Sequence, residues 1–155
     1  MHPKENQSRV AAELLRIEDP QERLAYVMDR AKRSPRIPEL HRTEGRLIRG
    51  CTTRVWLQSE STEAGACTFR TDSESAMVRG LACLIAEVYS DCTAVDIVSF
   101  NCTVLSEARL EHIITPTRLH GLAQLQKAIQ TFARQQTPHS SPSNPANLTP
   151  STEAG

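Results

Sequence analysis

We expect the fold to be arranged around one stretch of the sequence, Arg46-Leu-Ile-Arg-Gly50-Cys51-Thr-Thr-Arg54-Val-Trp56-Leu57. Two short runs of apolar residues, Leu47–Ile48 and Val55–Leu57, flank a segment with the small and polar residues of a turn. This pattern predicts two strand ends joined by a loop that carries Cys51. Gly50 stands directly before the cysteine and permits backbone angles that other residues avoid, so the chain can turn sharply there.

The charges near Cys51 bear on its reactivity. Arg46, Arg49 and Arg54 lie close to it in sequence, and positive charge favours the thiolate, which is the reactive form of cysteine. A buried structural cysteine fits the same residues, because free cysteine is among the most buried residue types. The residues alone leave a reactive and a structural thiol equally open.

The strand pattern continues after the cysteine loop. Val55–Glu60 and Cys67–Thr71 are rich in β-formers and predict a hairpin around a loop at residues 61–65. With Leu47–Ile48 they predict a three-stranded sheet, antiparallel because every connection is short. Cys67 alternates with Phe69 onto one face of this hairpin, so we expect Cys67 to pack in the core.

Helices are predicted before and after the sheet from their capping residues and their apolar spacing. The fold class expected is therefore α+β, with a small antiparallel three-stranded sheet packed against helices. We expect a flexible N-terminus at 1–9 and a disordered tail at 135–155. Two helices are predicted before the sheet, from residue 10 to near Glu18 and from Asp19–Pro20 to Arg33. Four are predicted after it: a helix begun by Asp72 or Ser73 that ends near Ser90, a short helix capped by Thr93, a helix over 104–113, and a helix begun by Thr115–Pro116.

Length and composition suggest one domain in 155 residues, of which 39% are hydrophobic. No apolar run approaches the roughly 20 residues that span a bilayer. The N-terminus shows no secretory signal, so we expect a cytoplasmic protein without membrane contact. The formal net charge is zero, which argues against general nucleic-acid binding.

The charge is unevenly distributed along the chain. Residues 30–54 carry eight Lys or Arg against two acids, a net charge of +6, whereas residues 55–117 carry three basic groups against nine acids, a net charge of −6. If the basic stretch surrounds the cysteine loop, it can steer an acidic partner. The alternative is a solvated surface on which the charges mix.

Five cysteines stand at positions 51, 67, 83, 92 and 102. Their number is odd and no pair is spaced as C-x-x-C, so we expect neither a disulfide framework nor a zinc site. Cys102 lies in a predicted loop and is the rival of Cys51 as a reactive thiol, although it lacks basic neighbours. His41, three residues before Glu44 in another loop, is either a base for Cys51 or simply exposed.

Three segments resemble the SufE family, the sulfur-acceptor partners of cysteine desulfurases. Residues 50–56 (GCTTRVW) resemble the family's G-C-x-S-x-V-W, with Thr53 where Ser is usual. Residues 73–81 (SESAMVRGL) resemble S-x-A-x-V-x-G-L, and residues 114–122 (ITPTRLHGL) resemble L-T-P-S-R-x-N-G-L. The three blocks keep their order, and the resemblance covers roughly residues 10–134.

This resemblance implies a fold shared with iron–sulfur scaffold proteins of the IscU type. It also implies that Cys51 takes persulfide sulfur from a pyridoxal-phosphate cysteine desulfurase of the SufS or CsdA kind, stimulates that enzyme, and delivers the sulfur to an iron–sulfur assembly scaffold. The protein then needs no cofactor of its own beyond a covalent persulfide on Cys51.

The resemblance also assigns the surroundings of the thiol. It places Arg118 near the cysteine loop, and His120 stands where the family has Asn, which puts any hydrogen bond of that amide in doubt. Gly50, Thr53, Arg49 and Arg54 complete the expected environment of Cys51. Two other classes stay open: an iron–sulfur scaffold or metal-binding module, and a thiol-redox protein in which Cys51 reacts with peroxide and Cys102 resolves the product.

Overall fold

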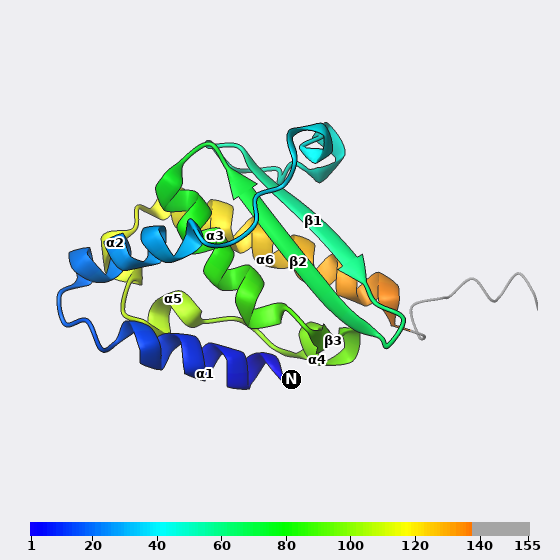
Figure 1. The fold of residues 1–155 in the computed structure, drawn as a ribbon, viewed down its shortest axis with the longest axis horizontal. Helices are drawn as coiled ribbons and strands as arrows, with labels where there is room; N and C mark the ends of the chain where they lie inside the picture. Colours follow the sequence, from blue (N-terminus) through cyan, green and yellow to red (C-terminus); the bar gives the residue numbers. More distant parts are fainter. Residues whose placement is uncertain (138–155) are drawn as a thin grey trace, which may run out of the picture.

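The computed structural model describes residues 1–137 and has the predicted α+β class (Figure 1). The predicted tail at 135–155 begins too early, because the last helix continues to Gln136, and residues 138–155 lie outside the described residues. The elements in chain order are α1 (Pro3–Leu14), α2 (Pro20–Ala31), the 3₁₀ turns Glu39–His41 and Glu44–Arg46, β1 (Val55–Ser61), β2 (Ala66–Ser73), α3 (Ala76–Tyr89), β3 (Cys92–Thr93), α4 (Ala94–Ser99), α5 (Val104–Glu107), the 3₁₀ turn Glu111–Ile113 and α6 (Pro116–Gln136).

The predicted hairpin forms the centre of the sheet. Strands β1 and β2 pair antiparallel from Val55 opposite Ser73 to Ser61 opposite Cys67. Gly65 closes the turn with a φ of +88°, a left-handed conformation that favours glycine. Cys67 is fully buried, as predicted.

The third strand is not the one predicted. The sheet order is β1-β2-β3, and β3 is Cys92–Thr93, a segment that the sequence pattern places at and beyond the end of a helix. Leu47 makes only an isolated bridge to Trp56. The segment around Leu47 is too short to form a strand, because a 3₁₀ turn ends at Arg46 directly before it and the chain turns at Gly50 directly after it.

The N-terminus is also more ordered than predicted. Helix α1 begins at Pro3, where the side chain of His2 accepts a hydrogen bond from the amide of Lys4. Asn6 is buried and its Nδ2 donates to the carbonyl of Val88 at 3.0 Å, while the Nε2 of Gln7 donates to the Oγ1 of Thr103 at 2.9 Å. The buried face of this helix begins with polar side chains, so its apolar spacing starts only at Val10.

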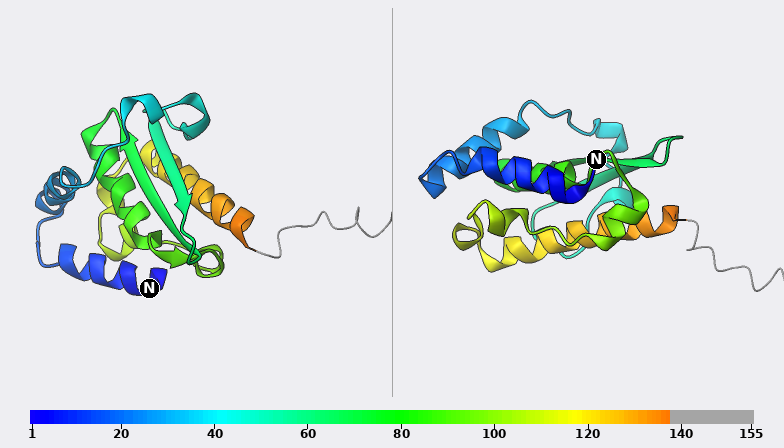
Figure 2. Two further views of the ribbon diagram at one scale, coloured as in Figure 1. Left: turned by 45° about the vertical axis from the view of Figure 1, so that its right-hand side comes forward. Right: turned by 90° about the horizontal axis from the view of Figure 1, so that it is seen from below.

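Helices α3 and α6 pack on one face of the hairpin, and α1 and α2 pack against α3 on its far side (Figures 1 and 2). Phe69 of β2 meets Phe132 of α6 edge to face, with ring centroids 5.9 Å apart. The largest fully buried side chains include Leu81 and Leu84 of α3 and Leu125 and Ile129 of α6. The core therefore lies between the sheet and these two helices.

The capping residues explain where most helices begin. Asp19 accepts from the amide of Glu22, Thr93 from that of Asp96, and Thr115 from that of Arg118, as predicted for α2, α4 and α6. Helix α3 is capped by Ser75 rather than by Asp72 or Ser73, since those two residues end strand β2.

A glycine allows two helices to pack closely. A Cβ on Gly80 of α3 would lie 3.2 Å from the Cα of Met28, so the missing side chain lets α2 approach α3. The helix expected over 104–113 is interrupted at Arg109, whose φ is +55°. That left-handed residue separates α5 from the 3₁₀ turn Glu111–Ile113.

Candidate functional site

Cys51 lies on a short loop whose two ends are held by hydrogen bonds. At the base of the loop, the amide of Ile48 donates to the carbonyl of Val55 at 2.8 Å. The hydroxyl of Ser73 donates to the carbonyl of Arg54 at 2.7 Å. Gly50 has a φ of +86°, the left-handed turn that its position before the cysteine suggests. The loop is therefore fixed at its ends and turns at Gly50.

The thiol faces the first turns of α6. Cys51 is half-buried, and its Sγ donates a hydrogen bond to the carbonyl of Gly121 at 3.5 Å. The cysteine lines a pocket of about 10 Å³, which is room for about one water molecule. The other lining residues come from the loop, from β1 and from helices α3 and α6: Thr52, Thr53, Val55, Val78, Thr117, Arg118, Gly121 and Leu122.

Gly121 decides how closely the thiol can approach α6. A Cβ at this position would lie 2.9 Å from the Sγ of Cys51, closer than real Cβ contacts allow. The sequence-based site did not include Gly121, although a glycine inside a helix costs up to about 1 kcal/mol relative to alanine and so signals a special contact. The missing side chain makes the space that shelters Cys51.

Burial controls the protonation of the thiol in this conformation. Desolvation raises the pKa of Cys51 above its ordinary value. Arg49 and Arg54 are exposed, and the Nε of Arg54 lies 3.9 Å from a carboxylate oxygen of Glu74. The expected thiolate-favouring effect of these arginines does not outweigh burial here, so Cys51 is held as a neutral thiol.

Arg118 and His120 lie on the first turns of α6, close to the cysteine loop. Arg118 is half-buried, lines the Cys51 pocket, and its Nη1 lies 3.5 Å from the sulfur of Met77. His120 is exposed, and its Nε2 would be 3.7 Å from a Cβ at Gly50. The structure thus brings both residues to the cysteine loop. His41 is exposed on a 3₁₀ turn and does not line the Cys51 pocket.

An ionic cluster around the buried Asp72, which the sequence did not reveal, anchors one end of the cysteine loop. Asp72 is fully buried, and its Oδ1 lies 2.6 Å from Nη2 of Arg36 and 3.5 Å from Nε of the buried Arg79. Its Oδ2 accepts from the amide of Ile37, and its Oδ1 accepts from the amide of Ser73, the residue that holds the loop at Arg54. The cluster therefore ties the segment after α2 and the cysteine loop to the end of β2.

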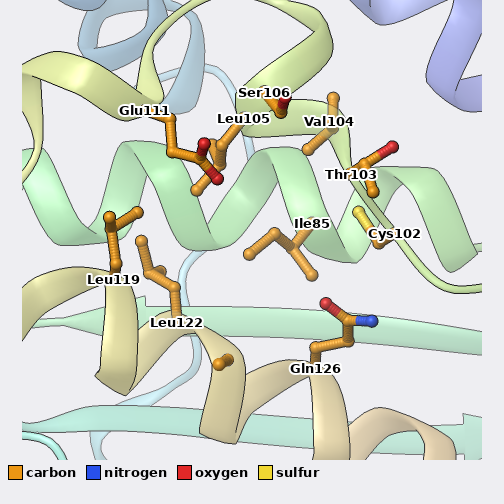
Figure 3. A pocket seen from close by; sticks show the side chains of 11 residues that line it. Ile85, Cys102, Thr103, Val104, Leu105, Ser106, Glu111, Leu119, Leu122 and Gln126 are labelled. Carbon is orange, nitrogen blue, oxygen red and sulfur yellow. The ribbon is translucent and has the colours of Figure 1, made fainter. Parts of the chain in front are cut away.

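The rival thiol lies in a different cavity. Cys102 lines a space of about 180 Å³ among side chains of α3, α5 and α6 (Figure 3). Burial raises the pKa of Cys102 to about 11. Leu122 lines both this cavity and the Cys51 pocket. Neither of the two pockets contains both thiols.

Residues 1–137 were also searched for metal-binding clusters and for membrane-spanning helices. This part of the chain contains no group of three or more His, Cys, Asp or Glu side chains that could hold a metal ion. None of the helices in the same range is long and apolar enough to cross a lipid bilayer.

Comparisons with known proteins agree with this fold and identify the family. The solution structure of a hypothetical protein from Thermus thermophilus superimposes with a TM-score of 0.69 at 17% sequence identity, covering 84% of this chain and 95% of that one. The chloroplastic quinolinate synthase of Arabidopsis thaliana is 30% identical over 99 residues, which are 64% of this chain but only 14% of that enzyme. The family model "SufE: Fe-S metabolism associated domain" matches residues 8–133. The chain belongs to the SufE family, and its domain is associated with iron–sulfur metabolism.

Proposed function

We propose that Cys51 accepts sulfane sulfur from the persulfide of a cysteine desulfurase and passes it to an iron–sulfur assembly scaffold. The observation that carries the proposal is the position of the thiol. Cys51 lies on a loop whose ends are held by hydrogen bonds and whose backbone turns at Gly50, in a pocket too small to hold a substrate beside it. Such a thiol suits a carrier that reacts with another protein.

The transfer step is a thiol–persulfide exchange. The Cys51 thiolate attacks the outer sulfur of the desulfurase persulfide, a new S–S bond forms on Cys51, and the S–S bond of the enzyme breaks. The enzyme cysteine leaves as a thiolate and takes up the proton that Cys51 gave to solvent. The sulfane sulfur changes its carrier without net oxidation or reduction, and the rate depends on the thiolate fraction of Cys51.

The resting conformation hinders this attack. The thiol is half-buried and neutral, and its Sγ faces Gly121 rather than solvent. Hydrogen bonds at Ile48 and Arg54 hold the two ends of the loop, so we expect the release of Cys51 from α6 to change the backbone between them. A partner that draws the loop outward exposes the thiol and lowers its pKa together.

The same shelter protects the thiol between transfers. Thiolates that are exposed are the ones that oxidise to sulfenic and sulfinic acids. Two arginines, Arg49 and Arg54, are exposed on the loop and give it a positive rim that suits an acidic partner surface.

The proposal is tested by desulfurase turnover without added reductant. A cysteine desulfurase is incubated with cysteine and each variant, and alanine is measured as the coproduct of sulfur removal. Wild-type protein should raise alanine formation, whereas Cys51→Ser should leave it at the level of the enzyme alone. Cys83→Ser removes another half-buried thiol and is the matched control that should behave as wild type. Equal stimulation by Cys51→Ser would exclude Cys51 as the acceptor.

A further inference from the structure

Two cysteines outside the site lie opposite each other in the sheet. The antiparallel pairing of β2 with β3 places Cys67 directly across from Cys92. Residues that oppose each other in an antiparallel pair point to the same face, and both cysteines are fully buried. Both are free thiols in this structure. The sheet thus places two buried thiols on directly opposed residues.

The backbone spacing of such a pair suits a covalent bond. Opposed residues in an antiparallel ladder have Cα atoms about 4.5–5.5 Å apart, and disulfides span Cα distances of about 4.4–6.8 Å. Their Cβ atoms are about 4.5–5.5 Å apart, slightly more than the roughly 3.5–4.5 Å of a disulfide. A small shift of the two-residue strand β3 closes this difference.

We infer that Cys67 and Cys92 form a latent cross-strand disulfide site, which a peroxide converts from two thiols into one bond between β2 and β3. One thiolate attacks the peroxide, the O–O bond breaks, and a sulfenic acid forms with release of water. The second thiol then displaces water from the sulfenic sulfur. Each sulfur loses one electron in total, and hydrogen peroxide is reduced to two molecules of water.

The present contacts of Cys92 can be given up at little cost. Its Sγ lies 3.4 Å from the carbonyl of Ser90 and 3.8 Å from that of Val88, and it accepts a hydrogen bond from Nδ2 of Asn6 at 3.5 Å. Rotation toward Cys67 breaks these three contacts. Asn6 keeps its hydrogen bonds to the carbonyls of Val88 and Ser90, so no buried amide loses all its partners.

Access to the pair is through opening of β3. This strand pairs with β2 at only two positions, and the amide of Asp91 directly before it adds one hydrogen bond to the carbonyl of Cys67 at 2.8 Å. Segments held by so few contacts open locally at a lower free energy than global unfolding requires. Burial raises the pKa of Cys67, and that of Cys92 to about 11, so in the closed state the reaction is slow.

The test must distinguish a bond from Cys67 to Cys92 from a bond to Cys83 or Cys102. Cleavage at arginines leaves Cys83, Cys92 and Cys102 on one peptide, residues 80–109, so peptide masses from wild-type protein do not identify the partner of Cys67. The triple variant Cys51→Ser, Cys83→Ser, Cys102→Ser retains only the pair. It also lacks the thiol of the proposed sulfur transfer, so the outcome is independent of that function.

The triple variant is treated with hydrogen peroxide under native conditions, remaining thiols are blocked with N-ethylmaleimide, and the intact mass is measured. We expect a monomer that has lost two hydrogen atoms, takes up no label, and unfolds at a higher temperature than before oxidation, with both changes reversed by dithiothreitol. The further change Cys67→Ala should abolish the unlabelled species. A folded triple variant that keeps two blockable thiols, or that forms only dimers, would overturn the inference.

If the triple variant does not fold, the linked peptides of oxidised wild-type protein are fragmented instead. A Cys67–Cys92 bond in that digest supports the inference. Linkage of Cys67 only to Cys83 or Cys102, or no linkage of Cys67 at all, contradicts it.

Discussion

At the scale of single residues, Cys51 and Gly121 determine each other's surroundings. The thiol occupies the space that a side chain on α6 would fill, with 2.9 Å between Sγ and a Cβ at Gly121. The same contact removes the thiol from water and raises its pKa. A change at position 121 therefore acts on the exposure and on the protonation of Cys51 together.

Gly121→Ala should displace Cys51 toward solvent. We expect its alkylation by iodoacetamide near neutral pH to become several-fold faster, with a loss of about 1–3 kcal/mol of stability from overpacking, offset in part by the gain of about 1 kcal/mol in helix propensity. Ala123→Gly alters an exposed position of the same helix and is the control that leaves the rate unchanged. An unchanged rate in a folded Gly121→Ala protein would show that Gly121 does not shelter the thiol.

The pH profile of this alkylation reports the protonation of the thiol. Because burial raises the pKa of Cys51, its thiolate fraction at a given pH is below that of free cysteine, whose pKa is about 8.5. The alkylation rate of wild-type protein should rise with pH and reach half of its maximum above that value, and in Gly121→Ala this midpoint should move down. A wild-type midpoint below that of free cysteine would contradict a sheltered thiol.

The sequence indicates one of the two glycines of this site but not the other. Gly50 is adjacent to Cys51, and a glycine between an apolar run and a polar turn predicts the left-handed φ that the structure shows. Gly121 follows Cys51 by seventy positions, and only folding brings them into contact. The same limit applies to Asp72, which looks like a helix cap in sequence and is instead a buried partner of two arginines.

At the scale of elements, the end of strand β2 connects the cysteine loop to the rest of the protein. Asp72 binds Arg36 and the amide of Ile37, and Ser73 holds the carbonyl of Arg54. Burial alone would raise the pKa of Asp72, but hydrogen bonds from Arg36 and from the amides of Ser73 and Ile37 outweigh it and lower the pKa below the ordinary value. Asp72 is thus a buried carboxylate whose charge is neutralised by its partners.

Asp72→Asn should destabilise the fold by about 2–4 kcal/mol, because it leaves the buried Arg79 without its counter-charge. The contribution of an acid with a lowered pKa is present above its unfolded pKa of about 3.9 and is lost as pH falls through the folded pKa. Urea unfolding should therefore show a large gap between wild type and variant near pH 7 that narrows below pH 4. Glu74→Gln, at an exposed neighbour, is the control. A constant gap would exclude the ion pairs as its cause.

Helices with strong caps were predictable, and elements made by tertiary contacts were not. Asp19–Pro20 and Thr115–Pro116 begin α2 and α6 as their capping chemistry predicts. The third strand has only two residues, too few for any periodicity, and exists because the chain returns to β2 after α3. The start of α1 buries Asn6 and Gln7. Polar residues at a terminus predict exposure to solvent, and the sequence does not reveal that these two side chains hydrogen-bond to Val88 and Thr103.

At the scale of the whole molecule, the buried thiols make stability depend on pH. Burial raises the pKa of Cys51 and Cys67, and brings that of Cys92 and Cys102 to about 11. A group whose pKa is raised by folding stabilises the fold fully below its unfolded pKa, and this contribution is lost as pH rises through the folded pKa.

The free energy of unfolding should therefore fall between about pH 8.5, the unfolded pKa of cysteine, and about pH 11, the folded pKa of Cys92 and Cys102. Urea titrations across this range measure the fall, and Cys102→Ala, which removes one of the titrating groups, should make it smaller. Stability that stays constant over the range, or a fall of equal size in Cys102→Ala, would contradict burial of a neutral thiol at Cys102.

Intact mass shows most directly whether Cys51 accepts the sulfur. Wild-type protein, Cys51→Ser and Cys102→Ser are each incubated with a cysteine desulfurase and cysteine, then separated from small thiols. We expect wild type and Cys102→Ser each to gain one sulfur atom, which reduction removes, and Cys51→Ser to gain none. A persulfide on Cys51→Ser, or none on wild type with a desulfurase shown to carry its own persulfide, would contradict the proposed role of Cys51.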